Sequence, residues 1–182
     1  TYTKNIDLSS QELAFNAAQI STFSVSFRGI QADAIVEYKL VKDVNSLHAG
    51  DHIIIAAKAA DKAISATQNG NNRASADVAK ADETITNPSD GVQIITLEDG
   101  SVANTAAFKA GNGYLYAASS SSNYLKTQAS VDANASWKIT VAADGTATIV
   151  AQGNFTRATM QYNSGSNIFS CYGSASQGAV EI

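Results

Sequence analysis

The sequence contains a single cysteine, Cys171, so no disulfide within the chain can support the fold. Cys171 lies in the alternating segment 168–172, on the same side of the predicted strand as Phe169. A lone thiol in such a strand is typically a small buried hydrophobe. Neither His48 nor His52 lies in a context that suggests a base for it, so we expect no nucleophilic cysteine.

Charged residues are scarce, at 15% of 182 residues with a net charge of −4. The twelve lysines and arginines are scattered, which excludes the basic surface that nucleic acid requires. No segment approaches the roughly 20 apolar residues that span a bilayer, and the start Thr1-Tyr-Thr-Lys4 has no signal-peptide pattern. Because 45% of the residues are hydrophobic, we expect a folded domain with no nucleic-acid partner and no membrane span.

The residue patterns of catalytic and metal sites are also missing. His48 and His52 flank an Ala-Gly-Asp turn that enters a strand, so their spacing does not place them on one helix face. Gly111-Asn-Gly113 lacks the strand–turn–helix setting of a phosphate loop. Asp99 and Asp144 are expected to bond their own backbone in turns. We therefore predict that the protein is not an enzyme and has no cofactor and no metal site.

What the sequence does contain is an internal repeat. Val92–Gly100 and Trp137–Gly145 begin about 45 residues apart, and in both an apolar residue alternates with a polar or small one before an Asp-Gly turn. Alternation followed by Asp-Gly predicts a β-strand that leads into a hairpin. The two copies are therefore expected to end corresponding units of an all-β domain.

Aligning the two copies divides residues 50–182 into three similar units. The predicted strands are 53–57, 63–66 and 92–97 in the first unit, 106–110, 114–117, 124–127 and 137–141 in the second, and 148–151, 159–162, 168–171 and 179–182 in the third. Equivalent turns end at Asn72, Asn123 and Asn167. Residues 74–90, an insert in the first unit, contain the only proline and predict a helical turn or a long hairpin.

The same alignment predicts which residues form the core. One layer of equivalent positions consists of Ile55, Phe108 and Ile149, and a second layer consists of Ile64, Leu115 and Met160. Trp137 is also expected to be a core residue.

Three four-stranded units of about 40 residues, each with a turn that contains glycine, resemble a β-trefoil. This resemblance implies an all-β fold for residues 38–182, a β-trefoil of twelve strands in three pseudo-repeats. Propeller blades have a similar period, but three blades are too few to close around a channel. The ricin-type trefoils that bind sugars carry Gln-x-Trp in each unit, whereas here Ala135 and Ser136 precede Trp137.

Two further resemblances point to a bacterial surface protein. Leu47–Ala56 and Gly113–Ala118 are similar to uncharacterised accessory domains of secreted bacterial proteins, which implies an extracellular or cell-surface location. Leu8–Phe15 followed by Phe23–Phe27 resembles the opening strands of bacterial immunoglobulin-like repeats. Such a sandwich needs about seven strands. Residues 1–37 are therefore expected to be a short N-terminal β extension, either packed on the next domain or left from a longer one.

Tyrosine and asparagine side chains gather near the turns of the second and third units. Sugars bind to flat apolar faces and to planar hydrogen-bonding groups, which these residues provide. The predicted ligand site comprises Tyr114, Tyr116, Asn123 and Tyr124. In the alternative interpretation the tyrosines only alternate between core and surface, and the asparagines only close turns.

Two functions remain open from the sequence. The first is a non-catalytic carbohydrate-binding module of a secreted or cell-surface bacterial protein, with a glycan as partner. The second is an interaction or structural module that binds another protein or positions a neighbouring domain, and the extension 1–37 favours it.

Overall fold

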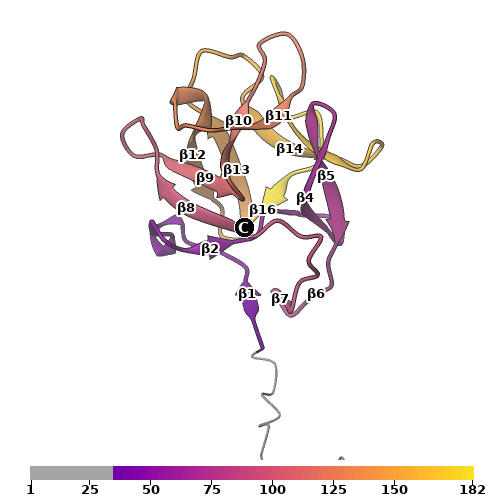
Figure 1. The fold of residues 1–182 in the computed structure, drawn as a ribbon. Helices are drawn as coiled ribbons and strands as arrows, with labels where there is room; N and C mark the ends of the chain where they lie inside the picture. The colour runs from indigo at the N-terminus through magenta and orange to yellow at the C-terminus, as the bar shows by residue number, and fades with distance from the viewer. Residues whose placement is uncertain (1–34) are drawn as a thin grey trace, which may run out of the picture. The chain divides into compact units, whose positions relative to one another are not determined.

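The computed structural model describes residues 35–182, and these form an all-β unit of antiparallel strands (Figure 1). The chain divides into two units, 1–34 and 35–182. The immunoglobulin-like strands predicted within residues 1–34 lie outside the described residues. Two short 3₁₀ helices, η2 (Val44–Ser46) and η3 (Ala133–Ala135), connect strands of the second unit.

Sixteen strands occupy the described residues. They are β1 (Glu37–Lys39), β2 (His52–Ile53), β3 (Ala56–Ala57), β4 (Lys62–Asn69), β5 (Asn72–Asp77), β6 (Lys80–Ala81), β7 (Thr84–Thr86), β8 (Ile95–Asp99), β9 (Ala106–Ala110), β10 (Gly113–Ala117), β11 (Leu125–Gln128), β12 (Ser136–Val141), β13 (Thr146–Ala151), β14 (Thr159–Asn163), β15 (Ile168–Tyr172) and β16 (Val180–Glu181).

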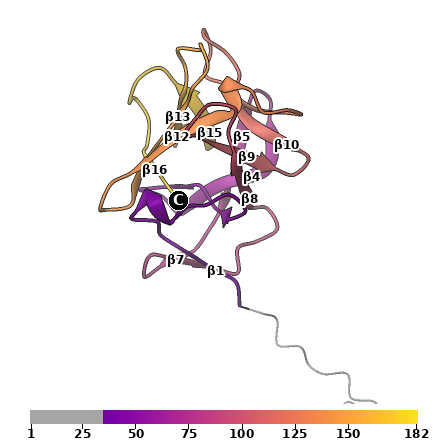
Figure 2. The same cartoon turned by 90° about the vertical axis from the view of Figure 1, so that its left-hand side faces the viewer.

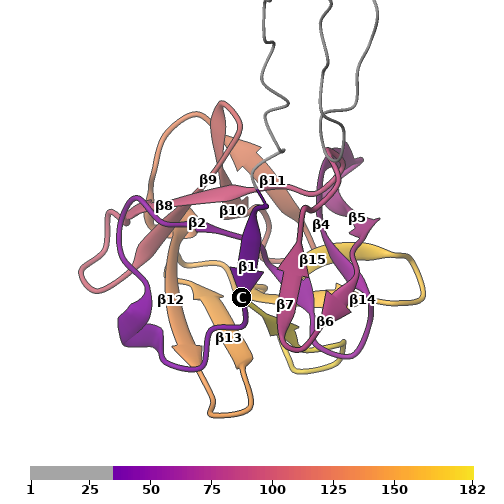
Figure 3. The same cartoon turned by 90° about the horizontal axis from the view of Figure 1, so that it is seen from below.

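Strands from the whole of this unit close into a ring of antiparallel pairs (Figure 3). β8 pairs with β2 and β9, β9 with β12, β12 with β13, β13 with β16, and β16 with β3. Only Ile54 and Ile55 separate β2 from β3, so the ring returns to the segment where it began. Closure of this kind leaves fewer of the free sheet edges that otherwise invite aggregation.

Three hairpins extend from the ring: β4–β5, β10–β11 and β14–β15. Each is joined to the ring at one strand, because β4 pairs with β3, β10 with β9 and β14 with β13. β5 also pairs with β15, which links the first hairpin to the third. Figures 1 and 2 show the hairpins toward the end of the unit away from β1.

The insert predicted at residues 74–90 contains no helix. Its first residues lengthen β5, and β6 and β7 form a hairpin that pairs with β1 in a separate three-stranded sheet. The Lys80 Nζ atom donates to the Ala57 carbonyl oxygen at 2.8 Å and to the Glu181 carboxylate at 2.9 Å. These contacts hold the hairpin against β3 and β16. Of the two alternatives predicted for the insert, the structure has a hairpin and no helical turn, but the hairpin is short, residues 80–86, because residues 74–77 belong to β5.

One apolar core fills the ring and the hairpins. All six residues of the two predicted layers belong to it, and each is at most 1% exposed. Trp137 is completely buried, as predicted, and stacks on Phe108 with ring centroids 5.5 Å apart. The indole Nε1 donates to the Leu115 carbonyl oxygen at 3.0 Å, so the polar atom of this large side chain is satisfied inside the core.

The structure has sixteen strands where the sequence predicted twelve. β1, β6 and β7 form the small sheet, which the repeat alignment did not include, and the first predicted strand is divided into β2 and β3. β5 is the fourth strand of the first unit, for which no range was predicted. β1 also crosses the predicted boundary between residues 37 and 38. Since β1 pairs with β7, residues 37–39 belong to a sheet of the second unit.

Candidate functional site

The predicted site lies on the β10–β11 hairpin. Leu115 of β10 is completely buried, whereas Tyr114 and Tyr116 are half-buried, so the two tyrosines share the outer face as alternation predicts. Lys126 lies opposite Tyr116 in the strand register. Tyr124 precedes β11 and its carbonyl oxygen accepts from the Ala118 N–H at 3.3 Å, which extends the pairing and places Tyr124 on the same face.

Tyr114 already has a partner within the protein. Its hydroxyl donates to Glu98 Oε2 at 2.7 Å, and Lys109 Nζ donates to the other oxygen of the same carboxylate at 2.9 Å. The three side chains form a row across β8, β9 and β10. Hydrogen bonds from Lys109 and then Tyr114 lower the pKa of Glu98, and the bond to Glu98 raises the pKa of Tyr114.

We expect the pKa of Glu98 to lie below that of an ordinary glutamate and to rise in Tyr114→Phe, and to rise further in Lys109→Met, because Lys109 has the larger effect. A pKa lowered by folding means a stabilising contribution that is present above the unfolded-state pKa and is lost as pH falls through the folded-state value. Carboxyl carbon chemical shifts measured against pH by NMR test this. An unchanged Glu98 titration in both variants would contradict the row of contacts.

Asn123 also has a partner within the protein. Its Oδ1 atom accepts from the Arg157 guanidinium at 2.7 Å. The Thr156 hydroxyl next to Arg157 donates to the Ser120 carbonyl oxygen at 2.9 Å, so the turn 119–123 is attached to the loop before β14. The Asn123 oxygen therefore helps to join the second and third units, which takes up one of its two acceptor positions.

Of the four predicted residues, Tyr116 and Tyr124 are those whose side chains make no hydrogen bond within residues 35–182. Both are half-buried, so part of each ring faces solvent. None of the four residues lines any of the three pockets described for this part of the chain. The predicted site is therefore an open face of a hairpin.

A pocket that sequence reasoning missed begins at the end of this face. It has a volume of about 560 Å³ and lies between the β4–β5 hairpin, the β9–β10 turn and the end of β11. Its polar lining consists of Arg73, Gln93, Asn112, Thr127 and Gln128. Gln128, which lies opposite Tyr114 in the register, belongs to both the outer face and the pocket.

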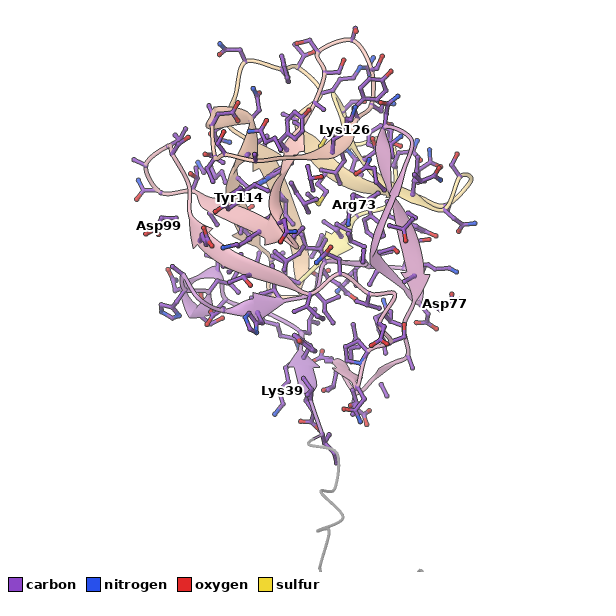
Figure 4. The ribbon with its side chains drawn as sticks, in the orientation of Figure 1. Lys39, Arg73, Asp77, Asp99, Tyr114 and Lys126 are labelled. Carbon is purple, nitrogen blue, oxygen red and sulfur yellow. The ribbon has the colours of Figure 1, made fainter. Side chains whose placement is uncertain are left out.

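Arg73 is the one charged side chain that lines this pocket. Figure 4 labels it beside the β4–β5 hairpin, on the side toward β10. The residue is 4% exposed, and burial lowers the pKa of its guanidinium. The signal in the sequence was that Arg73 is the one charged residue in segment 63–76. The sequence could not show that Arg73 lines a pocket, because the other lining residues Gln93, Asn112 and Gln128 come from distant parts of the chain.

A larger pocket, of about 650 Å³, lies at the base of the unit between β1, β7 and the segment around β3 and β16. Its most buried carboxylate, Glu181, accepts from Lys80 at 2.9 Å and lies 3.7 Å from Lys58 Nζ. The buried charge here is thus paired within the protein, and the contacts attach the β6–β7 hairpin to the ring.

Several features bear on other classes of protein. Cys171 is completely buried, and this burial raises the pKa of its thiol, as expected for a packing residue. Asp144 accepts from the Thr146 backbone N–H at 2.9 Å, which is the predicted turn bond. Within residues 35–182 there is no group of three or more His, Cys, Asp or Glu side chains placed to hold a metal ion, and no helix is long and apolar enough to cross a membrane.

No protein-family model and no curated protein matches this chain.

Proposed function

We propose that residues 38–182 form a β-trefoil. The support is a pattern of pairings that occurs three times: two strands of each unit belong to the closed ring, and the two strands between them form a hairpin. The hairpins are β4–β5, β10–β11 and β14–β15, and the ring strands are β2 with β3 and β8, β9 and β12, and β13 and β16. On this proposal β1, β6 and β7 are an addition to the first unit.

On this scaffold we propose a non-catalytic glycan-binding module of a secreted or cell-surface bacterial protein. The observation that carries it is the continuity, through Gln128, between an outer face with two unbonded tyrosines and a pocket lined by amide and hydroxyl groups. Tyrosine rings can stack on the C–H face of a sugar, and amides can bond its hydroxyls in both directions. A volume of about 560 Å³ lies in the range of about 300–1,000 Å³ usual for small-ligand pockets.

The test is a glycan array probed with the full chain, followed by calorimetric titration of the glycans that bind. We expect Tyr116→Ala to weaken binding by about three- to tenfold, the worth of one stacked aromatic contact. Lys138→Ala, an exposed change on β12, is the matched control and should leave the affinity unchanged. If Tyr116→Ala binds the glycan as tightly as wild type does, the outer face is not part of the binding site.

A second function, docking to another protein or to a neighbouring domain, is favoured by a different observation. Ile35 and Val36, directly before β1, are 71% and 47% exposed, and they are the exposed large apolar residues of the described chain. Adjacent exposed apolar side chains are typical of contact surfaces when they belong to a larger patch. A folded chain that binds no glycan on the array would place this function first.

A further inference from the structure

We propose that Arg73 forms a subsite for a carboxylate, so that the ligand of the pocket at the β9–β10 turn is an acidic saccharide of the uronic or sialic acid class. This inference rests on the proposed glycan-binding function and names the chemistry of its ligand.

The guanidinium of Arg73 is buried without a carboxylate. Its partners are neutral oxygens: the Ser65 carbonyl at 2.8 Å, Gln93 Oε1 at 3.1 Å and Gln68 Oε1 at 3.4 Å. An arginine has five N–H groups, so these three acceptors leave donors unused, and the buried Nε has no partner within residues 35–182. An uncompensated buried charge is costly, and a bound anion would offset that cost.

The environment of Arg73 differs from that of Glu181, the other buried charged residue of the described chain. Arg73 and Glu181 are the charged residues that are less than 9% exposed in the described part of the chain. Glu181 has two lysine partners, whereas Arg73 has no acidic partner there. The contrast is marked because acidic residues outnumber basic ones, 16 to 12, in the whole sequence. Of the two buried charges, the one without an oppositely charged partner is therefore Arg73, which lines a pocket.

The remaining lining selects a polar ligand with a single negative charge. No aspartate, glutamate or lysine lines this pocket, so an anion there meets no repulsion from a lining carboxylate. Asn112 and Thr127 present an amide and a hydroxyl that make no side-chain hydrogen bond within residues 35–182 and are suited to the hydroxyls of a sugar. The Gln128 amide N–H groups already donate to Ser130 and Asp132, and the Gln93 amide already bonds Ile94 and Arg73, so these two residues mainly shape the pocket. No aromatic residue lines it, so recognition inside the pocket depends on charge and hydrogen bonds, and stacking is left to the outer face.

Arg73 also has a structural task. Its bond to the Ser65 carbonyl oxygen lies where the β4–β5 register shifts, between Ile64 and Gln68. Replacing Arg73 can therefore loosen the hairpin as well as remove the charge. The decisive comparison is consequently made with ligands on the unaltered protein, and a second variant is taken at Asn112, which is exposed in the β9–β10 turn.

The experiment is calorimetric titration of the full chain with methyl glucuronide, its methyl ester and methyl glucoside, and with the methyl glycoside of N-acetylneuraminic acid and its ester. We expect at least one acid to bind about tenfold or more tightly than its ester, since the ester removes only the charge-assisted bonds. Arg73→Gln should abolish that preference, and Arg73→Lys should retain part of it because the charge remains without the planar fork. Asn112→Ala should weaken both acid and ester about equally.

The possible results distinguish failure of the carboxylate subsite from failure of glycan binding itself. Acids and esters that bind equally well would overturn the carboxylate subsite while leaving glycan binding intact. Acetate or a peptide carboxylate that competes as strongly as the acids would overturn the saccharide class. An array and titrations in which no sugar binds would remove the proposed function itself. A folded Arg73→Gln protein, checked by circular dichroism, that keeps the full acid preference would also overturn the proposal.

Discussion

Replacing Trp137 by alanine is expected to lower the free energy of unfolding by about 3–5 kcal/mol, as large aromatic-to-alanine changes in a core do. Trp137 is completely buried, stacks on Phe108 and donates its indole N–H to the Leu115 carbonyl oxygen. It belongs to β12, which pairs with β9 on one side and β13 on the other. A cavity here therefore touches the junction of the second and third units.

The measurement is urea unfolding followed by far-ultraviolet circular dichroism, because Trp137 is the only tryptophan and fluorescence would be lost with it. Lys138→Ala, the next residue and exposed, is the control and should change stability by no more than about 0.5 kcal/mol. Trp137→Phe should fall between the two, since it keeps a ring but leaves the Leu115 carbonyl without its donor. A Trp137→Ala protein as stable as the control would contradict the packing of this core.

The second and third units were predictable because their strands are regular. The predicted strand 106–110 has the bounds of β9, and β12 differs from its prediction at one end by one residue. Apolar and polar residues alternate in β12 before the Asp144-Gly145 turn, and β9 is followed by the Gly111 turn, so local sequence and final position agree there. The burial of Leu115 between the half-buried Tyr114 and Tyr116 follows from the same alternation.

The first unit was harder because its strands are irregular. The apolar run 53–57 is divided into β2 and β3, which pair with different strands, β8 and β16. A continuous apolar run does not indicate where such a change of partner occurs. The pairing of β1 with β7 joins residues nearly 50 apart, and no local pattern encodes that contact.

The candidate site was also predictable only in part. The outer face of β10 follows from alternation within one strand, whereas the partners of its residues do not. Tyr114 bonds Glu98 on β8, and Asn123 bonds Arg157 in the third unit, so both have contacts that sequence reasoning could not supply. Arg73 depends still more on the fold, since its pocket gathers residues from four separate segments.

Replacing Leu115 by alanine is expected to cost about 2–5 kcal/mol, and the result tests the threefold repeat as well as the core. Leu115 is fully buried in one core with Ile64 and Met160, its predicted equivalents in the other units. If the three positions form one layer, the three alanine variants should all be strongly destabilised. Since their side chains share that layer, the double variant Leu115→Ala with Met160→Ala should depart from the sum of the single changes.

The control for Leu115 lies directly across the hairpin. Thr127 is opposite Leu115 in the β10–β11 register, yet it is exposed, because β11 lies at the open edge of the sheet there. Thr127→Ala should therefore change the unfolding free energy by no more than about 0.5 kcal/mol. Urea unfolding followed by Trp137 fluorescence measures both variants, with the indole reporting from the core that Leu115 helps to fill. Equal stability of Leu115→Ala and Thr127→Ala would mean that strand register alone, and not a shared core layer, accounts for the apparent repeat.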